Sequence, residues 1–172
     1  RSSAEGSSIR KVVVACHCVE MLALAVWVGG LVSIIAAVIP AVFNTISMET
    51  GGRMLTRMFQ GYDRLALVSA GLIAAGTLVR IYGSTGNWRE QIGMAELALL
   101  ATMVVIVATL VFWLTPETAR LQEIVFGAKD DAKRIAYDNF FAYHRVARAL
   151  YITNLGLGIT LLCVKVKKWA RK

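Results

Sequence analysis

The sequence predicts an all-α membrane protein, a bundle of four transmembrane helices with amphipathic helices in its third connection. Apolar residues make up 57% of the chain and charged residues 17%, and the mean hydropathy is +0.60. Soluble domains have about 45–50% apolar and about 25% charged residues. Four apolar runs carry this excess, and none alternates with a period of two. Because backbone polar groups in lipid must be paired within their own segment or in a closed barrel, these runs are expected to be helices.

The first run covers residues 12–43 and is interrupted only by His17, Glu20 and Ser33. As a helix it would be about 48 Å long, whereas the hydrocarbon core of a bilayer is about 30 Å thick. It must therefore tilt, kink or project from the membrane, and Pro40 is expected to mark where the regular helix bends or ends. Residues 1–11 before it form a polar arm that should lack fixed structure unless a partner holds it.

The second run, residues 65–82, follows a polar connection at 44–61 that contains an amphipathic stretch. It is rich in small residues, including Gly71 and Gly76, which let helices approach closely in lipid and predict a central position in the bundle. A turn is expected at residues 83–87. The third run, residues 92–114, has Glu96 as its only charged residue.

Thr115, Pro116 and Glu117 have the pattern of a new helix start, with a capping hydroxyl, a proline at the first helical position and an acid in the first turn. Residues 116–143 are expected to form two amphipathic helices broken near Gly127 that dock on partners or on the bilayer surface. The apolar side chains expected to face partners or the bilayer surface are Leu121, Ile124, Val125, Phe140 and Phe141. The fourth span covers residues 147–166, so residues 12–166 form one membrane domain, followed by a basic tail at 167–172.

The net charge is +8, with 19 Lys and Arg against 11 Asp and Glu. The basic residues lie in connections and near the end of the chain rather than on one face of a soluble domain, which argues against nucleic-acid binding. Lys165 and the basic residues of the tail instead predict contact with anionic lipid headgroups. With Arg10 and Lys11 they favour a cytoplasmic or matrix location for both termini. The first residue is Arg1 rather than methionine, which fits removal of a targeting segment. We therefore expect a mitochondrial or other organellar inner membrane, with a bacterial inner membrane as the alternative.

Four ionisable residues fall on the terminal side of the membrane when the chain is threaded up and down: His17, Glu20, Arg80 and Glu96. Ionisable residues at membrane depth are costly and are by default candidates for function. One hypothesis is a proton or ion relay through these four groups. The other is that Glu20 and Pro40, about 30 Å apart on a helix, mark the two interfaces, and that Glu20 pairs with Arg80 or extends to the headgroups, with no role in transport.

Arg64, His144, Arg145 and Arg148 fall on the opposite side, where they are expected to anchor the helices at the interface. Because His17 and His144 lie on opposite sides, one copy of the chain is not expected to hold a bis-histidine haem. Cys16, Cys18 and Cys163 are read as small packing residues rather than ligands. No nucleophile–base pair or phosphate-binding loop is evident, so we predict no catalytic activity, no cofactor and no metal.

The sequence also resembles a known family. The resemblance begins with His17, the segment from Ala23 through Trp27-Val28-Gly29-Gly30, and Pro40-Ala41-Val42-Phe43. It continues in the following residues: Gly51, Gly52, Phe59, Tyr62, Pro116, Phe140, His144 and Asn154. These features resemble the transmembrane protein 205-like family of small four-helix membrane proteins, over about residues 16–160. The resemblance implies the fold and a membrane location and carries no established activity, so no catalytic residue is transferred.

The sequence leaves three functions open. The first is a non-catalytic accessory or structural subunit of a larger membrane complex, of the energy-transducing, respiratory kind, with lipids and other membrane subunits as partners. The second is a small transporter or channel-like protein, which should show a continuous polar path across the bundle. The third is a redox- or pigment-binding membrane subunit, which needs ligands at one depth.

Overall fold

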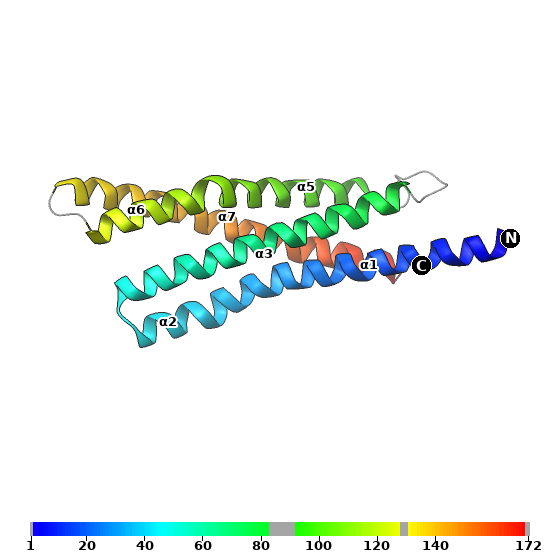
Figure 1. The fold of residues 1–172 in the computed structure, drawn as a ribbon, viewed down its shortest axis with the longest axis horizontal. Helices are drawn as coiled ribbons and strands as arrows, with labels where there is room; N and C mark the ends of the chain where they lie inside the picture. Colours follow the sequence, from blue (N-terminus) through cyan, green and yellow to red (C-terminus); the bar gives the residue numbers. More distant parts are fainter. Residues whose placement is uncertain (1, 83–91, 128–130, 171–172) are drawn as a thin grey trace.

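In a computed structural model, the chain folds into an elongated bundle of long helices (Figure 1). The structure describes residues 2–82, 92–127 and 131–170, with side chains in the first and last helices from residues 11 and 135 onward. The elements in chain order are α1 (Ser2–Ser33), η1 (Ile34–Val38), α2 (Ile39–Thr45), α3 (Met48–Tyr82), α5 (Met94–Thr109), η2 (Leu110–Leu114), α6 (Thr115–Gly127) and α7 (Asp131–Trp169). The turn expected at residues 83–87 lies outside the described residues.

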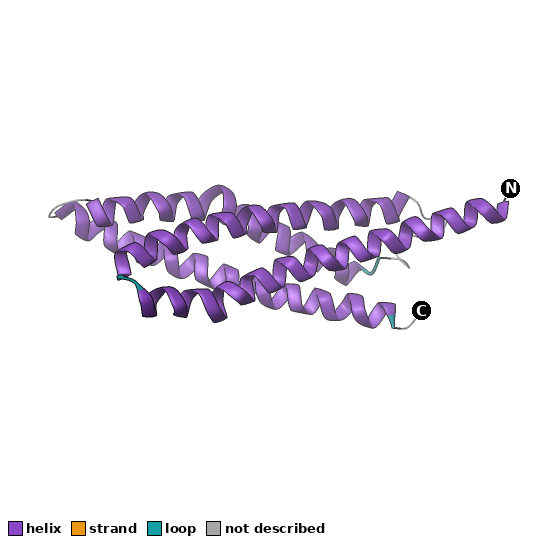
Figure 2. Ribbon diagram, turned by 60° about the horizontal axis from the view of Figure 1, so that its bottom comes forward, coloured by secondary structure: helices purple, strands orange, loops and turns teal. Residues whose placement is uncertain are grey.

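Among the described residues, four continuous helical segments run along the bundle, each long and apolar enough to cross a membrane: Lys11–Thr45, Met48–Tyr82, Met94–Gly127 and Ile135–Trp169. The described residues form helices and short connections, with no strand among them (Figure 2). The start of α1 and the end of α7 lie at the same end of the bundle (Figure 1). This confirms the expected all-α, four-span architecture. The backbone of the expected polar arm is helical from Ser2.

The regular α-helix is interrupted just before each proline, α2 and α6 begin one residue before Pro40 and Pro116 respectively, and the chain stays helical throughout. Each one follows a single turn of π-helix: η1 ends two residues before Pro40, and η2 ends two residues before Pro116. A proline lacks the N–H donor and its ring crowds the carbonyl four residues earlier, so a widened turn lets the helix continue past it. Thr115 is accordingly not a capping residue, and its hydroxyl donates instead to Asp63 Oδ2 at 2.6 Å.

The connections are largely extensions of the spans. The stretch expected as a polar connection at 44–61 is mostly the first part of α3, which begins at Met48. The two amphipathic helices broken near Gly127 are present as α6 and the first part of α7, and these pack against each other. Leu121 and Val125 are buried in this packing, so the expectation that they face partners or lipid is wrong, whereas Phe141 is exposed.

The centre of the bundle is filled by apolar side chains from all four spans. Leu24, Ile73, Met103 and Leu161 come from α1, α3, α5 and α7 respectively, and each has no exposed surface. Because lipid is as apolar as these side chains, close packing and not exclusion from water holds them together. Trp27 packs in the same core, and its carbonyl accepts a hydrogen bond from Tyr62 Oη at 3.1 Å.

Candidate functional site

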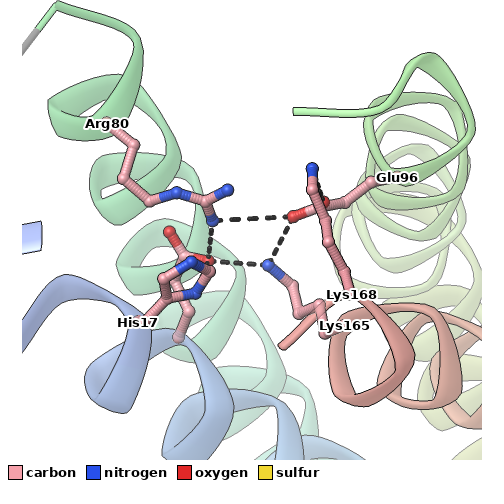
Figure 3. A network of polar contacts seen from close by, with 6 residues as sticks. His17, Arg80, Glu96, Lys165 and Lys168 are labelled. Atoms are coloured by element: carbon pink, nitrogen blue, oxygen red, sulfur yellow. Dashed lines mark hydrogen bonds and ion pairs between the residues drawn. The ribbon is translucent and has the colours of Figure 1, made fainter. Parts of the chain in front are cut away.

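A buried ionic cluster lies close to where α3 and α7 end and α5 starts, and Figure 3 shows its side chains at close range. Glu20 Oε2 accepts from Arg80 Nη1 at 2.7 Å and from Lys165 Nζ at 2.6 Å. Lys165 Nζ also donates to Glu96 Oε1 at 2.7 Å, and Arg80 Nη1 lies 3.6 Å from the same oxygen. We call these four residues the ionic cluster. It joins α1, α3, α5 and α7, one residue from each.

Two further side chains lie at its edge. His17 Nδ1 is 4.0 Å from Glu20 Oε2, and Lys168 Nζ is 3.5 Å from Glu96 Oε2. Both side chains are a little over a quarter exposed, at 29% and 27%, whereas the four residues of the cluster are buried. The structure thus brings together His17, Glu20, Arg80 and Glu96, the four residues singled out from the sequence.

Lys165 and Lys168 were expected to contact lipid headgroups near the end of the chain, whereas the structure places them in and beside the ionic cluster. The spacing of residues along α7 could have indicated that Lys165 is buried. Tyr151, Asn154, Leu161 and Lys165 recur at helical intervals and are all buried, so they share one face of α7. A lysine on the buried face of a span is expected to meet a carboxylate, since an unpaired charge there is costly.

Local packing at Gly76 determines where the Glu20 carboxyl sits. A Cβ atom added at Gly76 would lie 2.8 Å from both Cγ and Oε1 of Glu20. The absence of a side chain at this position of α3 therefore makes room for the acid of α1. By contrast, an added Cβ at Gly71 would meet nothing within 4 Å, so only one of these two glycines serves a close approach.

The charges of the ionic cluster balance. Two carboxylates, Glu20 and Glu96, face two basic groups, Arg80 and Lys165, so the buried core of the cluster is neutral. Among the described residues, Glu20 Oε1 and Glu96 Oε2 accept no hydrogen bond, although Lys168 lies near the second. Removing one member of such an arrangement would leave a buried charge without compensation.

A second polar group lies deeper along the bundle. Asp63 accepts from Thr115 Oγ1 at 2.6 Å and from Tyr151 Oη at 2.7 Å, and it is 4% exposed. We call these three residues the Asp63 cluster. Asp63 and Arg80 are both on α3 and seventeen residues apart, which separates the two clusters by about 26 Å along the helix. That distance is close to the thickness of the hydrocarbon core, about 30 Å.

The expected interface anchors are not part of the Asp63 cluster. Arg64, His144, Arg145 and Arg148 are all exposed, although Arg64 follows Asp63 directly and His144 stacks on Phe140 with ring centroids 5.8 Å apart. His144 precedes Lys165 by twenty-one residues on α7, which places it about 32 Å along the helix from the ionic cluster and hence from His17. One copy therefore cannot hold a haem between the two histidines. Among the described residues, no group of three or more His, Cys, Asp or Glu side chains could hold a metal ion.

Beyond the Asp63 cluster the bundle continues away from the termini. About fifteen residues of α3 lie on that side, which corresponds to about 22 Å. Charged side chains are exposed or partly exposed there, including Arg53, which pairs with Glu123 at 2.6 Å, and Arg120, which pairs with Glu117. We call this part of the molecule the projecting end: η1, α2, the first half of α3, α6 and the first half of α7.

The apolar second half of the first run lies in the projecting end. A Cβ added at Gly51 would lie 3.0 Å from Val42 Cγ1 and 3.5 Å from Phe43 Cδ1, so these residues are level with Gly51 on α3. Gly51 is twelve residues, or about 18 Å, beyond Asp63. The first run therefore extends along the bundle to the level of Gly51, about 18 Å past Asp63.

These features define the class of protein: an integral membrane protein built as a four-helix bundle, with polar clusters at two levels. The chain belongs to a family whose description is a domain of unknown function (DUF4149), and the family model matches residues 22–125. The match covers Trp27, Asp63, Arg80 and Glu96 but not His17, Glu20 or the span of α7. No curated protein and no solved structure matches the chain.

Proposed function

We propose that this protein is a non-catalytic accessory or structural subunit of a larger membrane complex. The observation that carries the proposal is the apolar surface of the projecting end. Phe43, Met48 and Met54 are 45%, 78% and 47% exposed, at a level where neighbouring helices expose charged residues. Large exposed apolar side chains outside the lipid are typical of protein interaction sites. A protein partner is the occupant that would cover them.

The interior of the bundle supports the same proposal. Leu24, Ile73, Met103 and Leu161 fill the space between the two polar clusters, and the ionic cluster is neutral within itself. Such an interior suits a rigid body that holds neighbouring subunits in position. We extend the proposal to an energy-transducing complex of a mitochondrial or other organellar inner membrane, with a bacterial inner membrane as the alternative. Lys167 and Lys168 in the last turn of α7 favour a matrix or cytoplasmic location for that end.

Replacing Phe43 with serine is expected to release co-purifying subunits. Central apolar side chains at interfaces commonly contribute about 2 kcal/mol or more, equivalent to about a thirtyfold loss of affinity. The measurement is the stoichiometry of polypeptides retained on the tagged chain in mild detergent. Leu22→Ser is the matched control, since Leu22 is 67% exposed on α1 at the level of the lipid. Partners lost equally with both variants, or with neither, would contradict docking through the projecting end.

A transporter or channel-like function is favoured by a different observation. Asn154 is 2% exposed, lies on α7 between Tyr151 and Lys165, and among the described residues has no hydrogen-bond partner at Nδ2 or Oδ1. A buried amide without partners costs about 1–3 kcal/mol. In a transporter it would be retained to hold water or a solute between the two clusters.

Replacing Asn154 with leucine separates the two functions. For a structural subunit, the substitution removes an uncompensated amide with little change of volume, so we expect the melting temperature in detergent to rise by a few degrees. Phe43-dependent partners should be retained. For a transporter, wild-type proteoliposomes should carry a solute or ion flux that Asn154→Leu abolishes. That second result would replace the proposed function.

A further inference from the structure

The Asp63 cluster holds a buried acid without a basic group beside it. Both carboxylate oxygens accept hydrogen bonds from neutral hydroxyls, Oδ2 from Thr115 and Oδ1 from Tyr151, and Asp63 is 4% exposed. Among the described residues, no lysine, arginine or histidine forms an ion pair with it, and the adjacent Arg64 is exposed. A buried carboxylate is costly unless a positive charge lies close to it. Asp63 therefore differs from the two acids of the ionic cluster, each of which meets a basic side chain.

A cavity of about 60 Å³ adjoins the Asp63 cluster, between α3, α6 and α7. Its wall includes both hydroxyl partners of the acid and three further polar residues: Thr56, Thr118 and His144. A single water molecule needs about 10–15 Å³, so the cavity has room for a small ion with a few water molecules. Thr56 precedes Asp63 by seven residues on α3, so the cavity extends about 10 Å from the acid toward the projecting end. His144 is exposed there, which places the opening of the cavity on that side.

The hydroxyl groups of this wall direct their hydrogens to other acceptors. Thr115 and Tyr151 donate to the carboxylate. Thr56 and Thr118 each donate to the carbonyl oxygen four residues earlier in the chain, and Thr56 is also bonded to Gln122 Oε1. A hydroxyl has one hydrogen and two lone pairs, so these four oxygens have only lone pairs left for a ligand. Oxygen lone pairs beside a carboxylate are the ligands that hard metal cations prefer.

We propose that this cavity binds one sodium ion, which compensates the charge of Asp63. The hydroxyl oxygens of Thr115 and Tyr151 lie 3.4 Å apart, close enough for one ion to contact both, and water completes the coordination toward His144. A single carboxylate balances a monovalent ion, whereas a divalent ion would keep half of its charge uncompensated in a buried position. The site uses no residue of the docking surface at Phe43, so it stands independently of the proposed function.

The first test is the melting temperature of the full-length protein in detergent, in sodium chloride and in choline chloride at equal concentrations. A ligand that binds only the folded state stabilises it in proportion to the logarithm of its concentration above Kd. At about ten times Kd, sodium is expected to raise the melting temperature by about 4 °C relative to choline, which is too large for the cavity. Equilibrium dialysis with radioactive sodium should saturate at one ion per chain. Equal melting temperatures in the two salts would show that Asp63 is neutralised by a proton and would overturn the proposal.

Two matched threonine variants locate the site. Thr118→Val removes one oxygen of the cavity wall and is expected to weaken sodium binding by about tenfold. Thr102→Val should bind sodium like the wild type, because Thr102 makes the same hydrogen bond to the carbonyl four residues earlier but is exposed on α5 and does not line the cavity.

Asp63→Asn removes the charge and is expected to abolish both the sodium-dependent shift and the bound ion. If this variant does not fold, the comparison of Thr118→Val with Thr102→Val decides alone. An equal sodium affinity in these two threonine variants, or a full sodium-dependent shift in Asp63→Asn, would place the effect of sodium elsewhere on the protein and overturn the proposal.

Discussion

Replacing Glu20 with glutamine is expected to lower the melting temperature of the protein in detergent by about 10 °C. Glu20 accepts from both Arg80 and Lys165, and all three side chains are buried. Without the carboxylate, Arg80 and Lys165 lose the acceptor that they share, and leaving a buried charge uncompensated costs about 3–5 kcal/mol. In a domain of this size each kcal/mol corresponds to about 2–4 °C. Thermal unfolding followed by circular dichroism measures the effect.

Glu117→Gln is the matched control, because Glu117 pairs with the exposed Arg120 on α6 and salt bridges at the surface contribute little. Its melting temperature should equal that of the wild type. A second variant tests the charge argument directly. Adding Lys165→Met to Glu20→Gln removes one charge of each sign and should recover part of the lost stability. If the double variant is no more stable than Glu20→Gln, the pairing of charges is not what holds this end of the bundle together.

Replacing Gly76 with alanine is expected to destabilise the bundle by about 1–3 kcal/mol, the usual cost of inserting a methyl group into a filled space. The new Cβ would lie 2.8 Å from Glu20 Oε1, so the carboxylate must move away from Arg80 and Lys165. The result should be a lower melting temperature despite the better helix propensity of alanine, which by itself contributes up to about 1 kcal/mol.

Gly71→Ala, on the same helix, is not expected to lower the melting temperature. An added Cβ there meets nothing within 4 Å, so only the gain in helix propensity remains and the melting temperature should be unchanged or higher. If both glycine variants behave alike, the space at Gly76 is not what positions Glu20.

The four spans could be predicted from the sequence because each depends only on the length and composition of one segment. An apolar run in lipid must pair its backbone N–H and C=O groups within itself, and the α-helix does this. The buried core residues Leu24, Ile73, Met103 and Leu161 lie in four such runs. The pairing of Glu20 with Arg80 could also be predicted, because spans that cross the membrane alternately up and down place these two residues at the same end of the bundle.

Two features could not be predicted in the same way. Pro40 and Pro116 indicate that the regular helix changes near them, but a proline by itself does not show that the change is a π-helical turn rather than a break in the helix. Lys165 was expected to contact lipid headgroups because it stands among the basic residues near the end of the chain. Its position on the buried face of α7, between Glu20 and Glu96, follows only from how that helix is rotated against α1 and α5.

The measurement that tests the proposed function most directly is site-specific photo-crosslinking in the native membrane. A photoreactive p-benzoylphenylalanine is placed at Phe43 in the projecting end, and at Leu22 as the lipid-level control. A subunit that docks through its projecting end should give a discrete crosslink to a different polypeptide from position 43, lost when Met54 is also changed to serine, and none from position 22. Crosslinks from position 43 only to lipid, or only to a second copy of this chain, would contradict the account.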